Sequence, residues 1–353
     1  MSQLVTVSKS DDQFWPMLTG RFSKTHFAQP VKNLYVNSAD ETVTFKIIEK
    51  SRLSLIGALA QWYSLARNIY LIFPILGGIS YLSFTYGLGQ MDLILSSFLA
   101  LQTFLMSLTL YNDYIDYVSG VDRVNEYSSQ KPLVQGLMRP YQAKQLAQVL
   151  LVLSMAFSSY CFLQRPQALG FALLALGIGF FFSSPLISKR YKGLTVVMTF
   201  ILAGPLLVLG YEYLLFENLS YPSALLGFIF GLHALKYDFS KQVRDIYYSS
   251  KAQVFTFSNF VGFERSKWLY LCLSLVHVMA LGLFAYMVGQ TQLWSLVIVA
   301  LAFESYINTL FFGAHSFLSS NISYSMGLQK LHYALENSLV VFFFLSPLWL
   351  SIL

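Results

Sequence analysis

Long apolar runs constrain this chain more than any other feature of its sequence. The residues from Leu93 to Tyr111, for example, include no charged side chain. Of the 353 residues, 11% are charged and 56% are hydrophobic, whereas soluble domains carry about 25% charged residues. An apolar run of about 20 residues is long enough to cross a bilayer as a helix. The sequence therefore predicts an all-α, polytopic membrane protein.

The apolar runs predict nine transmembrane helices within a membrane domain over residues 56–353. These helices are expected near residues 67–87, 93–117, 142–163, 167–187, 195–216, 222–245, 267–288, 293–313 and 334–353. Residues 1–55 are of mixed composition and predict a cytoplasmic N-terminal extension. Within this extension, residues 42–46 alternate weakly in polarity, which is typical of a short strand.

The distribution of Lys and Arg predicts the orientation of the helices. Of 23 such residues, only Arg165 falls in one of the short turns that join alternate pairs of helices. Connections rich in Lys and Arg remain in the cytoplasm, so the long connections and the N-terminus are predicted to be cytoplasmic. The net charge of +6 is then explained by loops that face anionic lipid, and nucleic acid is not expected as a partner.

A cluster of carboxylates follows the uncharged run. It consists of Asp113 and Asp116, within the sequence Asn-Asp-Tyr-Ile-Asp, and of Asp122 shortly afterwards. If the helix continues through the motif, Asp113 and Asp116 share one face. Proteins typically hold Mg²⁺ with one or two carboxylates, together with water and the phosphate oxygens of a substrate. The cluster therefore predicts a metal and diphosphate site at the membrane surface, in preference to a solvated helix end.

Two connections mix carboxylates with cations on the predicted cytoplasmic side, at residues 112–140 and 236–253. Carboxylates hold Mg²⁺, and Lys and Arg side chains bind diphosphate oxygens directly. A basic surface that binds lipid head groups would explain the cations, but not the carboxylates among them. We therefore expect both connections to converge on one cavity that faces the cytoplasm.

Residues 112–122, which read Asn-Asp-Tyr-Ile-Asp-Tyr-Val-Ser-Gly-Val-Asp, resemble the first aspartate-rich motif of the UbiA-type intramembrane prenyltransferases. The resemblance is greatest to the dihydroxynaphthoate polyprenyltransferases of the menaquinone pathway. Other elements of that branch are resembled, in the same order, by Lys131-Pro132-Leu133-Val134-Gln135-Gly136, Tyr191-Lys192-Gly193-Leu194 and Gly204-Pro205-Leu206-Leu207-Val208-Leu209-Gly210. The resemblance extends from about Trp62 to the end of the chain and implies a multi-pass protein of the bacterial inner membrane.

The activity implied by this resemblance is Mg²⁺-dependent transfer of an isoprenyl or polyprenyl chain within the lipid bilayer. The donor would be an isoprenyl diphosphate, and the acceptor an aromatic, quinone-precursor-like molecule. The resemblance implies Asp113, Asp116 and Asp245 as catalytic metal ligands, with Asp122 and Asp238 as further candidates. The implied substrate-binding residues are Asn112, Lys131, Arg244, Arg123, Lys192, Arg67 and Asn68.

The second aspartate-rich motif departs from the pattern of the branch. The sequence keeps Arg244-Asp245-Ile246, but Ser249 stands where the branch has another aspartate. Asp238 lies seven residues before Asp245 on the same helical stripe and is a candidate replacement ligand. Thr195-Val196 replaces a position where the branch often has a glutamate, which leaves the identity of the aromatic acceptor open.

Two other functions are compatible with a polytopic chain of this composition. A transporter would carry charges near the membrane midplane and often an internal repeat, whereas the charges here collect at one surface. A family member that only binds isoprenoid lipid would be consistent with the altered second motif.

Polar residues inside the predicted helices call for separate interpretation. Glu304 lies in the middle of a span and is expected to face the bundle interior. His233 is interpreted as a buried, hydrogen-bonded residue, and Glu336 as a residue near a helix end without a special role. Neither His277 nor His332 has a metal-binding spacing with cysteine.

Overall fold

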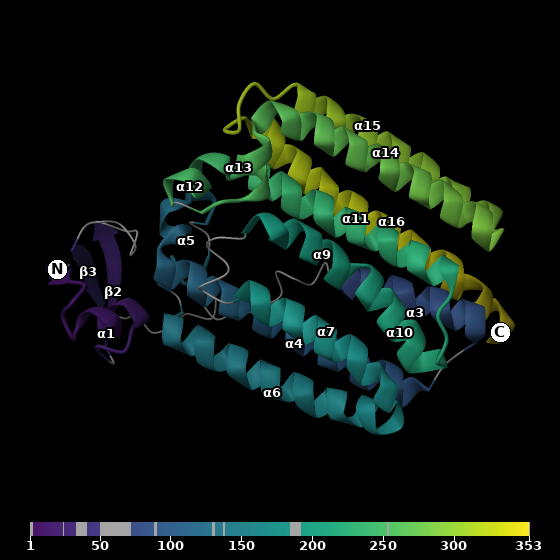
Figure 1. Ribbon diagram of the computed structural model, residues 1–353, viewed down its shortest axis with the longest axis horizontal. Coiled ribbons are helices and arrows are strands. Elements are labelled where there is room, and N and C mark those ends of the chain that lie inside the picture. Colours follow the sequence, from purple (N-terminus) through teal and green to yellow (C-terminus); the bar gives the residue numbers. More distant parts are fainter. Residues whose placement is uncertain are drawn as a thin grey trace. The chain divides into compact units, whose positions relative to one another are not determined.

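The structure is a computed structural model that describes residues 3–23, 25–32, 41–49, 72–87, 90–128, 131–136, 138–183, 192–252 and 254–352. Figure 1 shows the helices and strands along the chain. The chain forms two compact units, each assembled from several segments. The first unit consists of Met1–Asn68, Leu101–Met155 and Tyr248–Gln253. The second consists of Ile69–Ala100, Ala156–Tyr247 and Val254–Leu353.

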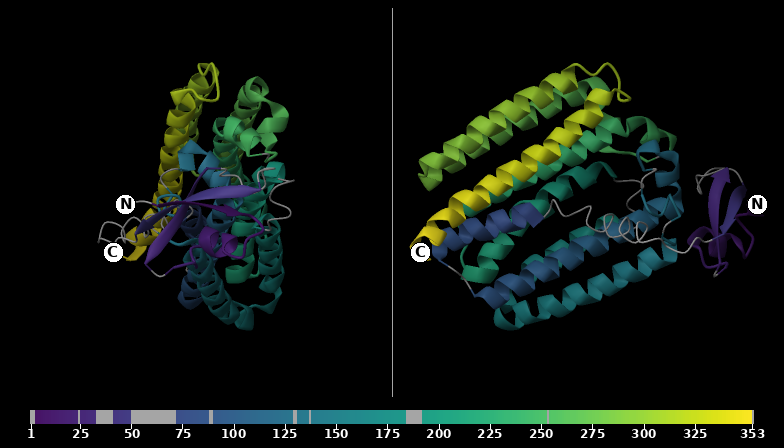
Figure 2. Two further views of the ribbon diagram at one scale, coloured as in Figure 1. Left: turned by 90° about the vertical axis from the view of Figure 1, so that its left-hand side faces the viewer. Right: turned by 180° about the vertical axis from the view of Figure 1, so that it is seen from behind.

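The first unit begins with a small antiparallel sheet, seen from two sides in Figure 2. Its strands pair in the order β1-β3-β2, and a short helix separates the first two along the chain. These elements are β1 (Gln3–Ser8), α1 (Phe14–Thr19), β2 (His26–Lys32) and β3 (Thr42–Glu49). The predicted strand over residues 42–46 is confirmed as part of β3, whereas the all-α class is wrong for this part of the chain.

Alternation of side chains along β3 explains why the sheet forms. Val43 and Phe45 are almost fully buried, whereas Thr42 and Thr44 have more exposed side chains on the opposite face. Successive side chains of a strand point to opposite faces, so this pattern gives the sheet one apolar side. Phe14 and Leu18 of α1 pack against that side and complete a separate hydrophobic core.

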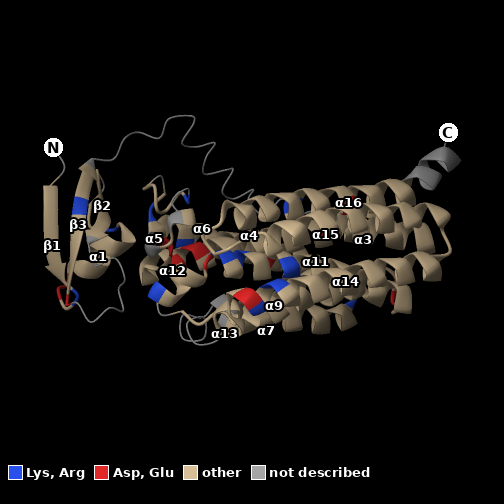
Figure 3. Ribbon diagram, turned by 90° about the horizontal axis from the view of Figure 1, so that it is seen from above, with Lys and Arg blue, Asp and Glu red and all other residues tan. Residues whose placement is uncertain are grey.

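The other regular elements of the described chain are helices. They are α3 (Ile72–Tyr86), α4 (Met91–Ser119), α5 (Val121–Val124), α6 (Pro140–Gln164), α7 (Leu169–Ser183), α9 (Thr195–Ala203), α10 (Pro205–Phe216), α11 (Tyr221–Arg244), α12 (Ile246–Lys251), α13 (Phe257–Val261), α14 (Phe263–Val288), α15 (Trp294–Phe312) and α16 (Ser320–Ile352). Short 3-10 turns occupy Glu126–Ser128, Pro166–Ala168, Lys192–Leu194 and Thr291–Leu293. Figure 3 shows long stretches of these helices without charge and a gathering of charged residues around α5.

Each predicted span overlaps a helix in the described part of the chain. Five helical stretches are long and apolar enough to cross a membrane, judged by length and composition. They are Met91–Ser119, Pro140–Gln164, Thr195–Phe216, Phe263–Val288 and Thr291–Phe312. The chain is therefore a mostly helical protein with several helices suited to the bilayer.

The last helix differs from its prediction, because α16 begins at Ser320 and not near residue 334. The added turns bury Ile322 and Met326, which are four residues apart and lie on one face. They also bury Gln329 and His332, and these polar residues interrupted the apolar run on which the prediction depended.

Close contact between two helical segments positions α11 within the second unit. A Cβ atom added at Gly204, between α9 and α10, would lie 2.4 Å from the carbonyl oxygen of Gly227 and 2.6 Å from the nitrogen of Gly231. Small residues at such a contact allow two backbones to approach closely. These glycines therefore allow the first half of α11 to pack closely against α9 and α10. The second half of α11, which ends at Arg244, continues from this contact.

Candidate functional site

The first aspartate-rich motif lies on the last turns of α4. The helix continues through the motif to Ser119, so the predicted shared face of Asp113 and Asp116 is confirmed. Both carboxylates are buried, with exposed fractions of 5% and 9%. Gly120 then adopts a left-handed conformation with φ of 89°, which glycine accepts without steric cost. This turn ends α4 and starts α5, which carries Asp122.

Lys131 brings the carboxylates of this first unit together. Its Nζ atom lies 2.9 Å from Oδ1 of Asp113 and 2.7 Å from Oδ1 of Asp122. The Ser128 hydroxyl donates a further hydrogen bond of 2.9 Å to Asp122. Asn112 donates through Nδ2 to Oδ2 of Asp116, at 3.1 Å. The predicted residues of the first motif therefore form one cluster, which we call the aspartate–lysine site.

Electrostatics at the aspartate–lysine site favour a bound cation. Burial raises the pKa of the Asp122 carboxyl; the Lys131 ammonium opposes this shift, and the charges of Asp116 and Asp113 add to it. One ammonium thus contacts two carboxylates, those of Asp113 and Asp122, and the charges of Asp113 and Asp116 both act on Asp122. An oxygen-rich donor set with excess negative charge fits a hard cation such as Mg²⁺.

The second motif pairs a cation with a carboxylate in the second unit. Arg244 ends α11, and its Nε lies 2.8 Å from Oδ1 of the next residue, Asp245. Its Nη2 lies 3.3 Å from the other carboxylate oxygen. From the sequence, Arg244 was predicted to bind the diphosphate and Asp245 to bind a metal ion. In the structure the two side chains bind each other. Ser249, where the branch has an aspartate, is a buried residue of α12.

Asp238 belongs to a hydrogen-bonded network that joins α9, α11 and α13. Its Oδ2 accepts from Nε2 of Gln242 at 3.2 Å and from the hydroxyl of Thr195 at 3.5 Å. Gln242 also donates to the Thr195 hydroxyl at 3.0 Å and accepts from the backbone nitrogen of Phe257 at 3.1 Å. These contacts favour a structural role for Asp238 over the predicted role as a replacement metal ligand.

The side chains of four predicted substrate-binding residues lie outside the described part of the structure. Arg67 and Asn68 lie outside the described residues. Arg123 belongs to α5 and Lys192 begins the 3-10 turn before α9, but the placement of their side chains is not described.

The N-terminal extension contacts the segment that carries Lys131. This contact was not predicted from the sequence. Arg139 donates through Nη1 to the carbonyl oxygens of Gly20 and Ser23, at 3.2 and 2.7 Å. Gln29 of β2 donates to the carbonyl oxygen of Val134 at 3.1 Å. Phe27 shares a hydrophobic core with Tyr117, Leu133 and Ala143. The sheet therefore holds the loop between α5 and α6 from one side.

A second polar cluster lies inside the helices of the second unit. Glu304 faces the bundle interior, as predicted, and is 4% exposed. His233 is buried as predicted, but neither of its ring nitrogens forms a hydrogen bond with a described residue. Glu336, interpreted as a residue without special role, is 1% exposed and faces histidines. His332 and Glu336 are four residues apart on one helix face, which is a signal that the sequence analysis missed.

The sequence profile described as the UbiA prenyltransferase family matches residues 71–320, well over half of the chain. No curated protein matches the sequence.

Solved structures of UbiA homologues share the fold. The apo homologue from Aeropyrum pernix K1 has a TM-score of 0.63 and 16% identity, over 78% of this chain and 97% of that one. The Archaeoglobus fulgidus homologue bound to GPP and Mg²⁺ has a TM-score of 0.57 and 18% identity, with the same coverage. A digeranylgeranylglyceryl phosphate synthase has a TM-score of 0.56 and 17% identity, over 81% of this chain and 98% of that one.

Proposed function

Because this chain belongs to the UbiA prenyltransferase family, we propose that it transfers an isoprenyl chain from its diphosphate to an aromatic acceptor, with Mg²⁺ as cofactor. The observation that carries this proposal is the aspartate–lysine site, where Lys131 contacts both Asp113 and Asp122. The Archaeoglobus fulgidus homologue, which was solved with GPP and Mg²⁺ and with DMAPP and Mg²⁺, supports the donor and the cofactor.

The side chains of the site supply two kinds of charge for this reaction. We assign Asp113, Asp116 and Asp122 as oxygen donors for Mg²⁺, which when bound neutralises the diphosphate leaving group. We assign Lys131 and Arg244 to the diphosphate oxygens, because ammonium and guanidinium groups bind phosphate through charge-assisted hydrogen bonds. Arg244 must then exchange its contact with Asp245 for a contact with substrate.

The reaction breaks the bond between the allylic carbon and the diphosphate oxygen, and diphosphate leaves with the electron pair. A ring carbon of the acceptor then bonds to the allylic carbon, and the ring loses a proton. Stabilising charge on the leaving group is the main requirement, and buried carboxylates and cations held in place before the reaction meet it. The apolar helices supply a wall for the isoprenyl tail and keep water from the cation.

The acceptor and the location follow from the sequence elements that resemble the menaquinone branch. We propose a quinone-precursor-like aromatic acceptor, although Thr195 replaces the glutamate often found in that branch. We also propose that the site faces the cytoplasm of a bacterial cell, because Lys and Arg gather in the connections that carry the site residues.

Purified protein in lipid nanodiscs, incubated with Mg²⁺ and isoprenyl diphosphates of several lengths, tests the proposal. The acceptor panel should include dihydroxynaphthoate, hydroxybenzoate and a prenylglyceryl phosphate, with products identified by mass spectrometry. The proposal predicts prenylation of an aromatic ring that Asp116→Asn abolishes. Prenylation of the glyceryl phosphate alone would contradict the aromatic acceptor, and binding of diphosphate without any product would favour a lipid-binding protein.

A further inference from the structure

Three histidines and two glutamates come together inside the second unit, although they are far apart in the sequence. His233 lies on α11, His277 on α14, Glu304 on α15, and both His332 and Glu336 on α16. The five side chains are between 0% and 4% exposed. We call this group the histidine–glutamate cluster. It shares no residue with the two aspartate-rich motifs.

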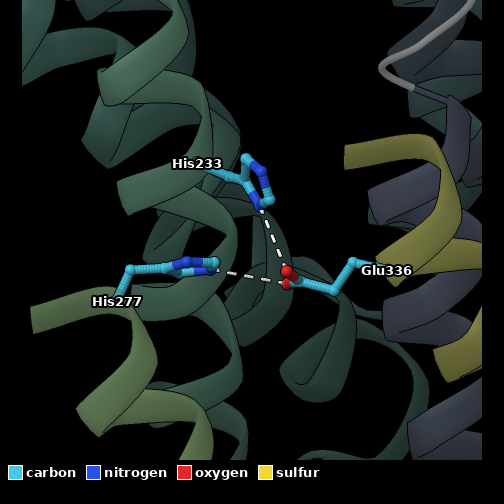
Figure 4. A group of neighbouring side chains, drawn as sticks. All are labelled: His233, His277 and Glu336. Atoms are coloured by element: carbon cyan, nitrogen blue, oxygen red, sulfur yellow. Dashed lines mark ion pairs between the residues drawn. The ribbon is translucent and has the colours of Figure 1, made fainter. Parts of the chain in front are cut away.

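Glu336 is the centre of the cluster. Figure 4 shows the imidazoles of His233 and His277 directed at its two carboxylate oxygens. Nδ1 of His233 lies 3.5 Å from Oε2, and Nε2 of His277 lies 3.5 Å from Oε1. Nε2 of His332 lies 3.4 Å from Oε2. Nitrogen and oxygen donors from three helices therefore converge around one carboxylate.

These separations are too long for hydrogen bonds between an imidazolium and a carboxylate, which measure about 2.7–2.9 Å. Both oxygens of Glu336, both ring nitrogens of His233 and Nε2 of His277 form no hydrogen bond with any described residue. Buried polar groups are almost always hydrogen-bonded, so a group of this size without partners indicates a missing ligand.

The spacing of the donor atoms fits one metal ion. Two ligands of a tetrahedral Zn²⁺ ion, each about 2.1 Å from the metal, lie about 3.4 Å apart. One donor atom from each of His233, His277 and Glu336 can be chosen so that all lie within 4.8 Å of one another. Two imidazoles and one carboxylate form a ligand set typical of Zn²⁺, and imidazole favours such metals over Mg²⁺.

The remaining charged groups act as supports for these ligands. Nδ1 of His277, the nitrogen that faces away from Glu336, is hydrogen-bonded to Nζ of Lys236 at 3.0 Å, and Oε1 of Glu304 lies 3.4 Å from the same nitrogen. Glu304 also pairs with the ammonium of Lys236 and accepts a hydrogen bond of 2.7 Å from Ser274. A hydrogen bond at the ring nitrogen that faces away from the metal fixes the orientation of a metal-binding histidine. The pair of Lys236 and Glu304 is neutral, which leaves Glu336 to balance a cation.

We propose that His233, His277 and Glu336 bind one divalent transition-metal ion of the Zn²⁺ class within the helix bundle, with His332 as a neighbouring donor. The site is distinct in chemistry from the oxygen-only aspartate–lysine site, and the proposal does not depend on prenyl transfer. A metal here would join α11, α14 and α16 through ring nitrogens of His233 and His277 and carboxylate oxygens of Glu336 that form no hydrogen bond with a described residue.

The experiment measures the metal content of full-length protein purified in detergent without chelator, by elemental analysis. After chelation and dialysis, Zn²⁺ alone is added back. We expect about one Zn²⁺ per chain, with affinity at least about tenfold lower in Glu336→Gln and His277→Ala. His315→Ala, which removes an exposed histidine outside the cluster, is the matched control and should bind as wild type. Asp113→Asn should also keep its Zn²⁺.

Wild-type protein that takes up no stoichiometric Zn²⁺ would overturn the proposal, as would unchanged binding by the folded cluster variants. X-ray absorption on the wild-type protein provides a test that does not depend on any variant folding. It should show imidazole nitrogen and carboxylate oxygen at about 2.0–2.2 Å from zinc. A zinc environment without imidazole would overturn the assignment.

Discussion

The aspartate–lysine site and the histidine–glutamate cluster are both concentrations of charge in a chain with few charged residues, yet they are built in different ways. The first comes from the single stretch 112–131 and uses oxygen donors balanced by one ammonium. The second comes from four helices and places imidazole nitrogens around a buried carboxylate. If both proposals hold, one chain binds a hard cation at the oxygen donors of the first site and a borderline cation where the helices of the second site meet.

The largest expected effect concerns the support of the histidine–glutamate cluster. Glu304→Gln leaves the Lys236 ammonium buried beside a neutral amide, and Lys236 is 0% exposed. We expect the free energy of unfolding to fall by about 3–5 kcal/mol, because one partner of a buried ion pair has been removed. Denaturant unfolding in detergent measures this difference.

Two variants sharpen that measurement. Adding Lys236→Met to Glu304→Gln removes the unpaired charge, so the double variant should be more stable than the single one. Glu264→Gln removes an exposed carboxylate from its pair with Lys267, which should cost less than about 1 kcal/mol. Equal losses in Glu304→Gln and Glu264→Gln would contradict the difference between a buried and an exposed carboxylate.

The next effect concerns the counter-charge of the aspartate–lysine site. Lys131→Met removes the ammonium that contacts Asp113 and Asp122. Hydrogen bonds to charged groups contribute about 1.5–3 kcal/mol, so the KM for the isoprenyl diphosphate should rise by about 10- to 100-fold. Mg²⁺ should bind more tightly, because the carboxylates lose a competing cation.

Steady-state kinetics measure the KM for the isoprenyl diphosphate, and isothermal titration measures the affinity for Mg²⁺. Lys144→Met, which removes a nearby cation placed 5.6 Å from the ring centre of Tyr114, is the control and should change neither. Weaker Mg²⁺ binding by Lys131→Met would mean that Lys131 organises the carboxylates and does not compete for them.

A smaller effect is expected where the N-terminal sheet holds the loop of the aspartate–lysine site. Arg139→Ala removes the hydrogen bonds to Gly20 and Ser23, which should loosen the extension by about 1–2 kcal/mol. Cleavage of the first 49 residues by protease should become faster, without a change in zinc content. Arg265→Ala, at an exposed residue of α14, serves as the control. Unchanged cleavage would show that other contacts hold the sheet.

The smallest effect concerns the altered second motif. Asp238 accepts hydrogen bonds from Thr195 and Gln242, so Asp238→Ala should cost about 1 kcal/mol of stability. The Mg²⁺ concentration for half-maximal activity should not change. Ser249→Asp, which restores the carboxylate of the branch, should lower that concentration. A raised Mg²⁺ requirement in Asp238→Ala would identify Asp238 as a metal ligand after all.

The sequence predicted the aspartate–lysine site better than the histidine–glutamate cluster for a physical reason. Asp113 and Asp116 are neighbours along one helix, so helical periodicity alone places them on one face. His233, His277 and Glu336 are joined only by the packing of three helices, and no spacing in the sequence encodes that contact. The local signs of a buried cluster were Glu304 in the middle of an apolar run and the four-residue spacing of His332 and Glu336.

Local sequence patterns also predicted the helices and strands better than the contacts between them. Continuous apolar runs predicted the helices, but they placed the start of α16 too late, because Gln329 and His332 interrupt the run while facing the interior. Weak alternation around Phe45 predicted β3, but not its partners, because strand pairing depends on contacts between distant segments. Arg244 and Asp245 were correctly located at a helix end, whereas their pairing with each other required the structure.

The proposed Mg²⁺-dependent prenyl transfer is tested by diphosphate release from an isoprenyl diphosphate, measured against Mg²⁺ concentration. We expect release by wild-type protein that depends on Mg²⁺ and falls by about 10²–10³-fold in correctly inserted Asp113→Asn, which keeps the shape of the side chain but loses its charge. Release by Asp113→Asn at the wild-type rate, or no release by wild-type protein at any Mg²⁺ concentration, would contradict it.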